Sequence, residues 1–367
     1  METGKKLEEY LSNGVENIVK GILKASLKNP KASIFMAKYA MNSKKAREKR
    51  KMAEMSGEHI PPFLIASITE QCNLHCKGCY ARANHSCQDD FGTNGLLTDA
   101  DWNNIFTQAE DLGIEFILLA GGEPFVRKDV LQQAANHPNI LFPIFTNGTL
   151  LDEAYMKLLN QNRNLMPVIS LEGNQSTTDA RRGEGVYQKL EETMEQLHKN
   201  GILFGASITV TKQNMKEVLA DDFVQKLKSA GTKAIVYVEY VPVNSTMHEL
   251  APDDQTRKEM MERLDAHRAA VTEMVFIAFP GDEMTSGGCL AAGRGFFHIN
   301  SRGDAEPCPF SPYSDTNVIN TSLKETLQSP LFNKLQTNGN LMQEHIGGCV
   351  LFEQQEQVKA MIEVHTE

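Results

Sequence analysis

Between residues 63 and 240, short apolar runs alternate with longer stretches whose apolar residues recur every three or four positions. The short runs predict buried strands, and the longer stretches predict helices with one face on a core. Strands are expected at 63–69, 116–120, 141–146, 167–171, 203–210 and 234–240. Helices are expected near 98–112, 128–136, 152–161, 184–200, 215–229 and 255–272. This alternation predicts a parallel α/β architecture, and by itself it leaves a partial eight-stranded barrel and a doubly wound sheet both open.

The first 55 residues have a helical pattern of their own. One helical face is formed by Val15, Ile18, Val19, Ile22 and Leu23, and a second helix follows Pro30 and runs to Lys51. Residues 18–51 contain eleven Lys or Arg and one acid, Glu48. One interpretation is a basic amphipathic element that contacts an anionic membrane surface or an acidic partner. The other is a helical flap packed on the main domain with a solvated basic tip.

The pattern changes again near Phe276, where glycines become frequent and three of the cysteines occur. The segment 296–308 is typical of a β-hairpin that turns at Ser301–Asp304. We therefore expect a helical extension over 1–58, an α/β domain over 59–275 and a small α+β module over 276–367.

Composition and charge narrow the class of protein. The chain has 367 residues, a net charge of -10 and no apolar run near the roughly 18–20 residues that span a bilayer. The first residues lack the apolar stretch of a signal peptide, so a cytoplasmic protein is expected. The acidic balance argues against nucleic acid as a partner. The seven cysteines are odd in number and unevenly spaced, which favours metal binding or catalysis over disulfides.

Three cysteines, Cys72, Cys76 and Cys79, follow the first predicted strand with the spacing C-x3-C-x2-C. Four thiolates usually hold a cubane four-iron cluster, so three would leave one iron open to another ligand. A loop at the carboxyl end of a parallel strand is where α/β enzymes place their active sites. A zinc site is the alternative, although zinc-binding cysteines more often come as two pairs, and no second pair occurs here.

This spacing resembles the signature of the radical S-adenosylmethionine (SAM) superfamily, and Cys72-Asn-Leu-His-Cys-Lys-Gly-Cys-Tyr80 is close to the form found in its SPASM and Twitch branch. Further motifs follow in order at strand ends: Gly121-Gly-Glu-Pro124, Thr146-Asn-Gly148, Ser170-Leu-Glu-Gly173 and Asp179-Ala-Arg-Arg182. The resemblance covers roughly residues 63–245. Two departures are Gly78, where the family often has an aromatic residue, and Glu172, where an aspartate is commoner.

The resemblance implies a partial (β/α)6 TIM-like barrel that binds a four-iron cluster and SAM. Its SAM site would comprise Gly121, Gly122, Glu123, Pro124, Ser170, Glu172 and Arg182. Glu123 would hold the amino group of SAM and Arg182 its carboxylate, as an acid and a planar guanidinium suit those charges. A low-potential electron donor of the flavodoxin or ferredoxin type would reduce the cluster. Reductive cleavage of SAM would then give a 5′-deoxyadenosyl radical, which takes a hydrogen atom from the substrate.

A second set of cysteines lies in the C-terminal module. Cys289 and Cys308, with Gly303 between them, resemble the opening of a SPASM/Twitch domain, and Cys349 is the natural third thiolate. The resemblance implies one auxiliary four-iron cluster in a Twitch-like module. Its fourth iron would be open to substrate or bound by His345, Glu353 or Cys87. The alternatives are three unrelated reduced cysteines here and a free thiol at Cys87.

The leading hypothesis is thus a radical SAM enzyme with an auxiliary cluster, acting on a small molecule, sugar, nucleotide or lipid. A peptide- or protein-modifying maturase is the alternative within enzymes, and a non-catalytic iron–sulfur carrier is the alternative outside them. Glu239, Asp282 and Asp304 are candidates for a general base only by their position at a strand end or in the glycine-rich tail. The substrate, the product and the catalytic residues are not determined by the sequence.

Overall fold

A single curved sheet of nine strands organises the computed structural model, which describes residues 2–27, 29–89, 95–242, 245–282, 288–337 and 348–363. The strand order is β7-β6-β5-β4-β3-β2-β1-β8-β9, and every neighbouring pair is parallel except β8 and β9. The six predicted strands are β1 Phe63–Ser67, β2 Phe116–Ala120, β3 Phe142–Thr146, β4 Leu165–Leu171, β5 Gly205–Val210 and β6 Ala234–Glu239. The partial barrel is therefore confirmed over the doubly wound alternative, since β1 to β6 are adjacent in chain order.

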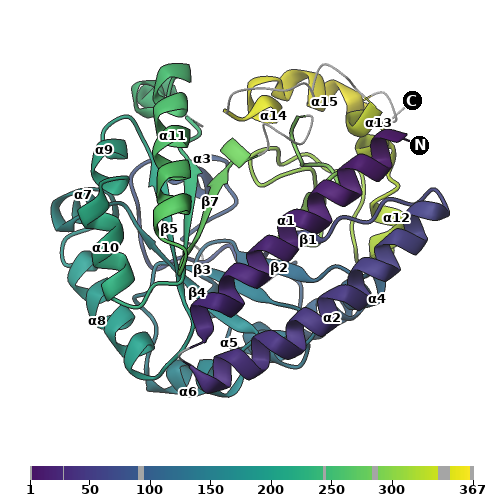
Figure 1. Cartoon of the computed structure of the whole chain (residues 1–367). Helices are drawn as coiled ribbons and strands as arrows, with labels where there is room; N and C mark the ends of the chain where they lie inside the picture. The colour runs from purple at the N-terminus through teal and green to yellow at the C-terminus, as the bar shows by residue number, and fades with distance from the viewer. Residues whose placement is uncertain are drawn as a thin grey trace.

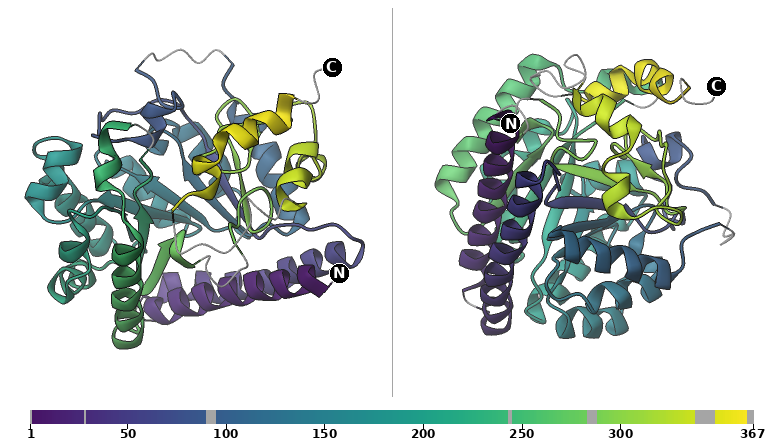
Figure 2. Two further views of the ribbon diagram at one scale, coloured as in Figure 1. Left: turned by 90° about the horizontal axis from the view of Figure 1, so that it is seen from above. Right: turned by 90° about the vertical axis from the view of Figure 1, so that its right-hand side faces the viewer.

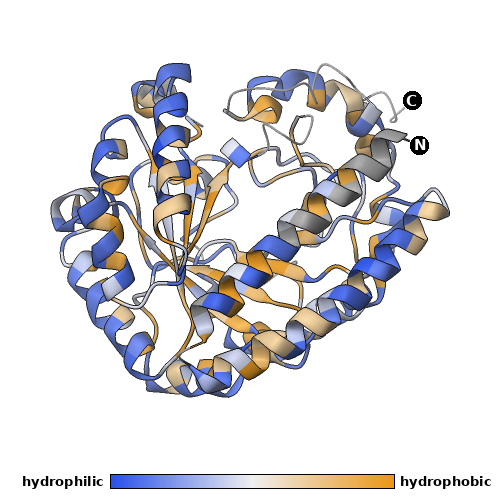
Figure 3. Cartoon of the chain, in the orientation of Figure 1, coloured by the Kyte–Doolittle hydropathy of each residue, from blue (hydrophilic) through white to orange (hydrophobic). Residues whose placement is uncertain are grey.

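Helices cover the outside of this sheet, as the alternation predicts (Figure 1). They are α4 Asp99–Leu112, α5 Lys128–Ala135, α6 Glu153–Gln161, α7 Gln175–Arg182, α8 Val186–Lys199, α9 Met215–Val218, α10 Asp221–Ser229 and α11 Asp254–Ala270. Side chains at their first turns fix where several begin: Thr98 caps α4, Asp152 caps α6 and Asp253 caps α11. The apolar side chains are packed between sheet and helices, and hydrophilic residues face outward (Figure 3).

The N-terminal extension is a pair of helices, α1 Glu2–Ser26 and α2 Pro30–Met55, which lie side by side in all three views (Figures 1 and 2). Val19 and Ile22 of α1 and Met36 and Tyr39 of α2 are buried in a cluster with residues that begin the strands, such as Phe116. The Tyr39 hydroxyl donates to the backbone oxygen of Glu115, just before β2, at 2.8 Å. The pair therefore covers the amino ends of the strands, as the packed-flap interpretation predicts.

The C-terminal segment extends the sheet at both edges. The strand β7 (Val275–Phe279) pairs with β6, while β8 (Phe296–Ile299) pairs in parallel with β1 and antiparallel with β9 (Ala305–Glu306). The predicted hairpin is confirmed, but its pairing with β1 and the strand β7 were not predicted. The remaining described helices of this segment are α12 Leu323–Thr326, α13 Pro330–Thr337, α14 Val350–Glu353 and α15 Gln355–Glu363. The sheet thus runs through the predicted boundary near residue 275.

Polar contacts fasten this segment to the barrel. His298 of β8 contacts Ser67 at the end of β1 (2.8 Å) and Glu306 of β9 (2.7 Å). Arg302 at the hairpin turn forms an ion pair with Glu70 at 2.8 Å. The hairpin is therefore held at the carboxyl end of β1, beside the loop that carries the first three cysteines. None of the described helices is long and apolar enough to cross a membrane.

Candidate functional site

The first cysteine loop leaves β1 and ends at the short helix α3 (Tyr80–Ala83). Cys72, Cys76 and Cys79 are each partly exposed at the carboxyl end of the barrel. The N–H of Lys77 in this loop donates to the backbone oxygen of Arg181 in α7, at 2.9 Å. Gly78 has φ +67, and a Cβ there would lie 3.0 Å from the hydroxyl of Tyr240. A glycine between two of the cysteines is therefore required by both conformation and space.

The thiol of Cys72 has the most distinctive environment of the three. The side chain of Cys87, buried and not in a disulfide, forms a hydrogen bond with it, and the Asn147 amide nitrogen lies 4.0 Å from its Sγ. This hydrogen bond is the largest of the effects that lower the pKa of Cys72 to about 6, against the opposing effect of burial. Burial instead raises the pKa of Cys76. Cys87 is thus a direct neighbour of the first cysteine, which the sequence did not predict.

Glu123, in the Gly-Gly-Glu-Pro turn after β2, joins two of the predicted motifs. Its carboxylate accepts hydrogen bonds from Thr146 Oγ1 (2.7 Å), the Asn147 N–H (2.7 Å) and the Phe125 N–H (3.1 Å). Thr146 ends β3 and Asn147 follows it, so the motif after the third strand holds the carboxylate of the motif after the second. Glu123 is 1% exposed, and this burial raises its pKa to about 7.

The two glycines of this turn lie against the backbone of another segment. A Cβ on Gly121 would lie 2.3 Å from the Thr69 oxygen, and one on Gly122 would lie 2.1 Å from the Gln71 oxygen. The close approach is therefore to the backbone that leads into the cysteine loop. The turn and the loop are also joined by hydrogen bonds, with Gly122 N–H donating to Thr69 and Glu123 N–H donating to Gln71. Glycine at both positions is needed to place the loop against Glu123.

Glu172, just beyond β4, forms ion pairs with two arginines of α7. Its Oε1 accepts from Arg182 Nη2 at 2.6 Å and Nε at 3.0 Å, while Arg181 Nη1 lies 2.6 Å away without hydrogen-bond geometry. Oε2 of this buried carboxylate has no hydrogen-bond partner among the described residues. Arg182 Nη1 also lies 4.0 Å from Cys76 Sγ. Arg182 therefore bridges Glu172 and the cysteine loop, whereas Ser170 lies two residues earlier, within β4.

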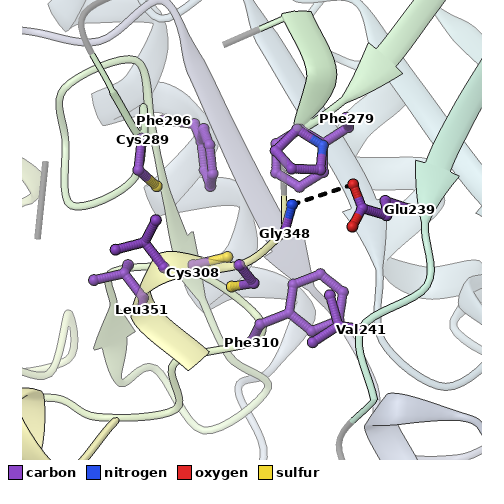
Figure 4. Close-up of a pocket in the computed structure, with 12 residues that line it drawn as sticks. Glu239, Val241, Phe279, Cys289, Phe296, Cys308, Phe310, Gly348 and Leu351 are labelled. Atoms are coloured by element: carbon purple, nitrogen blue, oxygen red, sulfur yellow. Dashed lines mark hydrogen bonds between the residues drawn. The ribbon is translucent and has the colours of Figure 1, made fainter. Parts of the chain in front are cut away.

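The second set of cysteines is brought together by the fold. Cys289, Cys308 and Cys349 come from three separate segments and line one cavity, together with Glu239, Phe279 and other residues (Figure 4). Glu239, the last residue of β6, accepts from Arg257 at 2.6 and 2.8 Å and from the Gly348 N–H at 3.2 Å. Glu239 thereby links the residue before Cys349 to the barrel. Sequence position at a strand end marked Glu239, but nothing local marked Arg257.

The two sets of cysteines are neighbours through one aromatic contact. Tyr80, directly after Cys79, packs against Phe310, two residues after Cys308, with ring centroids 4.8 Å apart. The side-chain amide of Asn84 also donates to the Pro309 oxygen at 3.2 Å. Burial raises the pKa of Tyr80, as do the nearby thiols of Cys79 and Cys308. The partly buried side chain of Tyr80 therefore lies between the two cysteine sites.

Several other sequence candidates lie away from this mouth or have structural partners. Asp282 accepts from Arg268 Nη2 at 2.7 Å and from the Ala278 N–H at 2.9 Å. Asp304 accepts from the side-chain amide of Asn317 at 2.9 Å within the hairpin turn. Glu353 is exposed, and His345 lies outside the described residues.

The donors fit iron–sulfur clusters better than a single ion. Within the described ranges, no three His, Cys, Asp or Glu side chains converge closely enough to hold one metal ion. The thiolates of a cubane cluster bind different iron atoms, so they surround a larger space than the ligands of one ion. At both sites the sulfur donors are cysteines alone, and at the first site the pKa of Cys72 is already lowered toward the thiolate that a cluster needs.

Comparison with known proteins indicates the class of enzyme to which this chain is similar. Residues 66–223 match the family model described as the radical SAM superfamily. The match covers less than half of the chain, and it supports a radical SAM enzyme that uses a four-iron cluster and SAM as the class of this chain. Its relatives are consistent with the SPASM/Twitch branch, whose members carry auxiliary clusters, as the motifs predict.

Two proteins of Methanosarcina barkeri illustrate the relationship. The AdoMet-dependent heme synthase is 26% identical over 302 residues, which are 75% of this chain and 85% of that protein. The Fe-coproporphyrin III synthase is 30% identical over 162 residues, 43% of this chain but only 39% of that protein. The similarity to the second protein thus leaves more than half of its length unmatched.

Solved structures share the fold at low identity. Streptococcus suis SuiB bound to S-adenosylmethionine superposes with a TM-score of 0.64 at 18% identity, covering 80% of this chain and 72% of SuiB. The structure called native anSMEcpe with bound AdoMet gives 0.57 at 18% identity, covering 76% and 81%. At such identities the likeness establishes the fold of this chain alone.

Proposed function

We propose that this chain binds SAM at the mouth of the barrel, beside a cluster held by Cys72, Cys76 and Cys79. When bound and reduced, the cluster and SAM supply a 5′-deoxyadenosyl radical that takes a hydrogen atom from the substrate. The observation that carries the proposal is the meeting of Glu123, Asn147, Arg182 and the cysteine loop at one end of the sheet. A carrier of iron–sulfur clusters has no need of these charged groups.

The residues of this site would divide the work of holding SAM. Glu123, when ionised, offers a buried negative charge to the ammonium group, and Thr146 and Asn147 hold its carboxylate in place. Gly121, Gly122 and Pro124 set the turn that carries Glu123. Glu172 fixes the guanidinium of Arg182 near Cys76, and Ser170 precedes it on β4. Arg182 already donates two hydrogen bonds to Glu172. To bind the SAM carboxylate, as the resemblance implies, its guanidinium would contact both carboxylates at once or give up its bonds to Glu172.

We further propose that Cys289, Cys308 and Cys349 hold one auxiliary four-iron cluster. Their cavity also contains the Glu239 carboxylate and the aromatic side chains of Phe279 and Phe310, which would limit access of water. We do not assign Cys87 as its fourth ligand, because the Cys87 thiol interacts with Cys72 at the first site. The Glu239–Arg257 pair would position Cys349 through Gly348.

For the substrate we propose a small molecule, with a tetrapyrrole as the first class to test. The AdoMet-dependent heme synthases of M. barkeri and Nitratidesulfovibrio vulgaris match over 85% and 83% of their own lengths, whereas the sporulation killing factor maturation protein of Bacillus subtilis matches over 41% of its length. A peptide is the second candidate, because the sporulation killing factor maturation protein of Bacillus subtilis is 25% identical over 178 residues. A flavodoxin- or ferredoxin-type donor in the cytoplasm would supply the electrons. The basic segment 18–51 would contact an anionic partner.

The test is anaerobic reconstitution with iron and sulfide, followed by addition of SAM and dithionite. We expect about eight iron atoms per chain, as two four-iron clusters require, together with 5′-deoxyadenosine. About four iron atoms with SAM cleavage would remove the auxiliary cluster from the proposal. Iron without SAM cleavage would favour a carrier, and zinc without cleavage would overturn the proposal. Deuterium transfer from a labelled porphyrin or peptide into 5′-deoxyadenosine would then identify the substrate class.

A further inference from the structure

The solvent face of α2 carries an unusual concentration of exposed apolar side chains. In the described part of the chain, six large apolar residues are highly exposed, and five of them lie between residues 27 and 55. They are Leu27 (68%), Ile34 (60%), Met41 (68%), Met52 (70%) and Met55 (85%). The sixth is Ile319, which is remote in sequence. Single exposed apolar residues are ordinary, but a line of them along one helix indicates a contact surface.

These residues form a line because of their spacing. With about 100° per residue, Ile34, Met41 and Met52 fall within about 20° of one another around the helix axis. The side chains of α2 that pack on the barrel, Met36 and Tyr39 among them, lie roughly on the opposite side. The helix is therefore apolar on two opposite faces, one turned to the barrel and one to solvent. We call this exposed line, Ile34, Met41 and Met52, together with Leu27 just before the helix and Met55 at its end, the α2 stripe.

Lysines border the α2 stripe on both sides. Lys31, Lys38 and Lys45 recur every seven residues on one side of the stripe, and Lys44 and Lys51 lie on the other. All five are exposed, and none takes part in an ion pair between described residues. One acid, Glu48, lies on the same face of α2 as the stripe. An apolar line between cationic rows is the pattern of a helix that lies in the interface of an anionic bilayer.

The position of α2 favours a lipid surface as its partner over an acidic electron donor or a second copy of this chain. The helix packs on the residues that begin the strands, whereas the cysteine loop leaves the other end of β1. An acidic electron donor bound to α2 would thus lie across the barrel from the clusters, a poor place from which to reduce them. A second copy related by a twofold axis would bring the lysine rows of both chains together, and like charges oppose that contact.

We infer that the α2 stripe and its flanking lysines dock this chain on an anionic lipid surface, with the mouth of the barrel turned away from the lipid. This deepens the proposed contact of residues 18–51, and it does not depend on the radical chemistry. The apolar side chains would enter the interface, and the lysines would meet the lipid phosphates. The buried face of α2 would remain on the barrel, so docking requires no unfolding of the helix pair.

Co-sedimentation of the reconstituted full chain with sucrose-loaded vesicles tests the inference. We expect binding to vesicles of phosphatidylglycerol and phosphatidylcholine, and little to phosphatidylcholine alone. Binding should weaken as salt is raised, since salt screens the lysine–phosphate attraction. The substitutions K31E/K38E/K45E should weaken binding by at least about tenfold. The substitutions I34S/M41S/M52S should weaken binding to a similar degree, by removing the side chains that enter the interface.

Matched controls separate docking from general charge and exposure. K157E/K199E/K359E makes the same change of charge at exposed lysines outside α2, and I319S removes the remaining exposed apolar side chain. Both should bind vesicles like the unmodified chain. Iron content and 5′-deoxyadenosine formation without vesicles should be equal in all variants, which distinguishes failed docking from failed chemistry. Equal binding to both vesicle types, loss of binding in the controls, or a dimer that I34S/M41S/M52S abolishes would each overturn the inference.

Discussion

The two cysteine sites differ in how they are built, although the fold places them side by side. Cys72, Cys76 and Cys79 belong to one loop of eight residues, whose path is set by Gly78, Gly122 and the contact with Arg181. Cys289, Cys308 and Cys349 come from three segments, and the last is fixed to the barrel through Gly348 and Glu239. The first site therefore depends on local backbone geometry, and the second depends on tertiary contacts.

The largest effect is expected at the first loop. C76S should abolish formation of 5′-deoxyadenosine and lower the iron content from about eight to about four atoms per chain, because only the first cluster binds SAM. C87S is the matched control, since it removes the thiol beside Cys72 without removing a proposed ligand. It should keep both clusters. Iron analysis and product chromatography measure the two outcomes, and SAM cleavage by C76S at the unmodified rate would contradict the assignment.

Loss of the second cluster should leave the first cluster and its cleavage of SAM intact. C308S should also lower the iron content to about four atoms, but it should retain cleavage of SAM while losing turnover of the substrate. Electron paramagnetic resonance of the reduced protein should then show one cluster signal where the unmodified chain shows two. Loss of SAM cleavage in C308S, with the iron of the first cluster still present, would mean that the two sites are not independent.

Glu239 should matter for the second site alone. E239Q removes the buried partner of Arg257 and leaves only the exposed Asp254, and breaking a buried ion pair costs up to roughly 3–5 kcal/mol of unfolding free energy. It should also loosen the segment before Cys349 and change the auxiliary cluster signal. E115Q is the matched control, because Glu115 forms a buried pair with Arg50 at the other end of the barrel. It should destabilise the fold and leave both cluster signals unchanged.

The smallest effect is a pH dependence at Glu123. Its pKa in the folded chain is raised from 4.5 to about 7, so between these values the folded state holds a proton that the unfolded state has released. Stability from this group therefore falls as pH rises from about 4.5 to 7. Binding of the SAM ammonium needs the ionised form, so SAM affinity should fall by up to about tenfold per pH unit below 7. Calorimetry of SAM binding would check this slope, and E123Q should bind weakly at every pH.

Most of the barrel could be predicted because its signals are local. The apolar runs at β1 to β6 and the helical periods between them appear directly in the order of residues, and the observed bounds differ from the expected ones by a few residues. The strand β7 was missed because it lies where the pattern changes toward glycine. The pairing of β8 with β1 was missed because the partner lies more than two hundred residues away.

The sequence by itself determined the chemistry: the cysteine spacing, the motifs at successive strand ends and their order indicated radical SAM chemistry. Only the tertiary structure decided which groups meet. It directed Cys87 to Cys72, Arg182 to Glu172 and Tyr80 to Phe310, and it assembled Cys289, Cys308 and Cys349 around one cavity. It also showed which face of α2 the barrel buries, leaving a second apolar face in solvent. Residue identity fixes what a group can do, whereas long-range packing fixes what it touches.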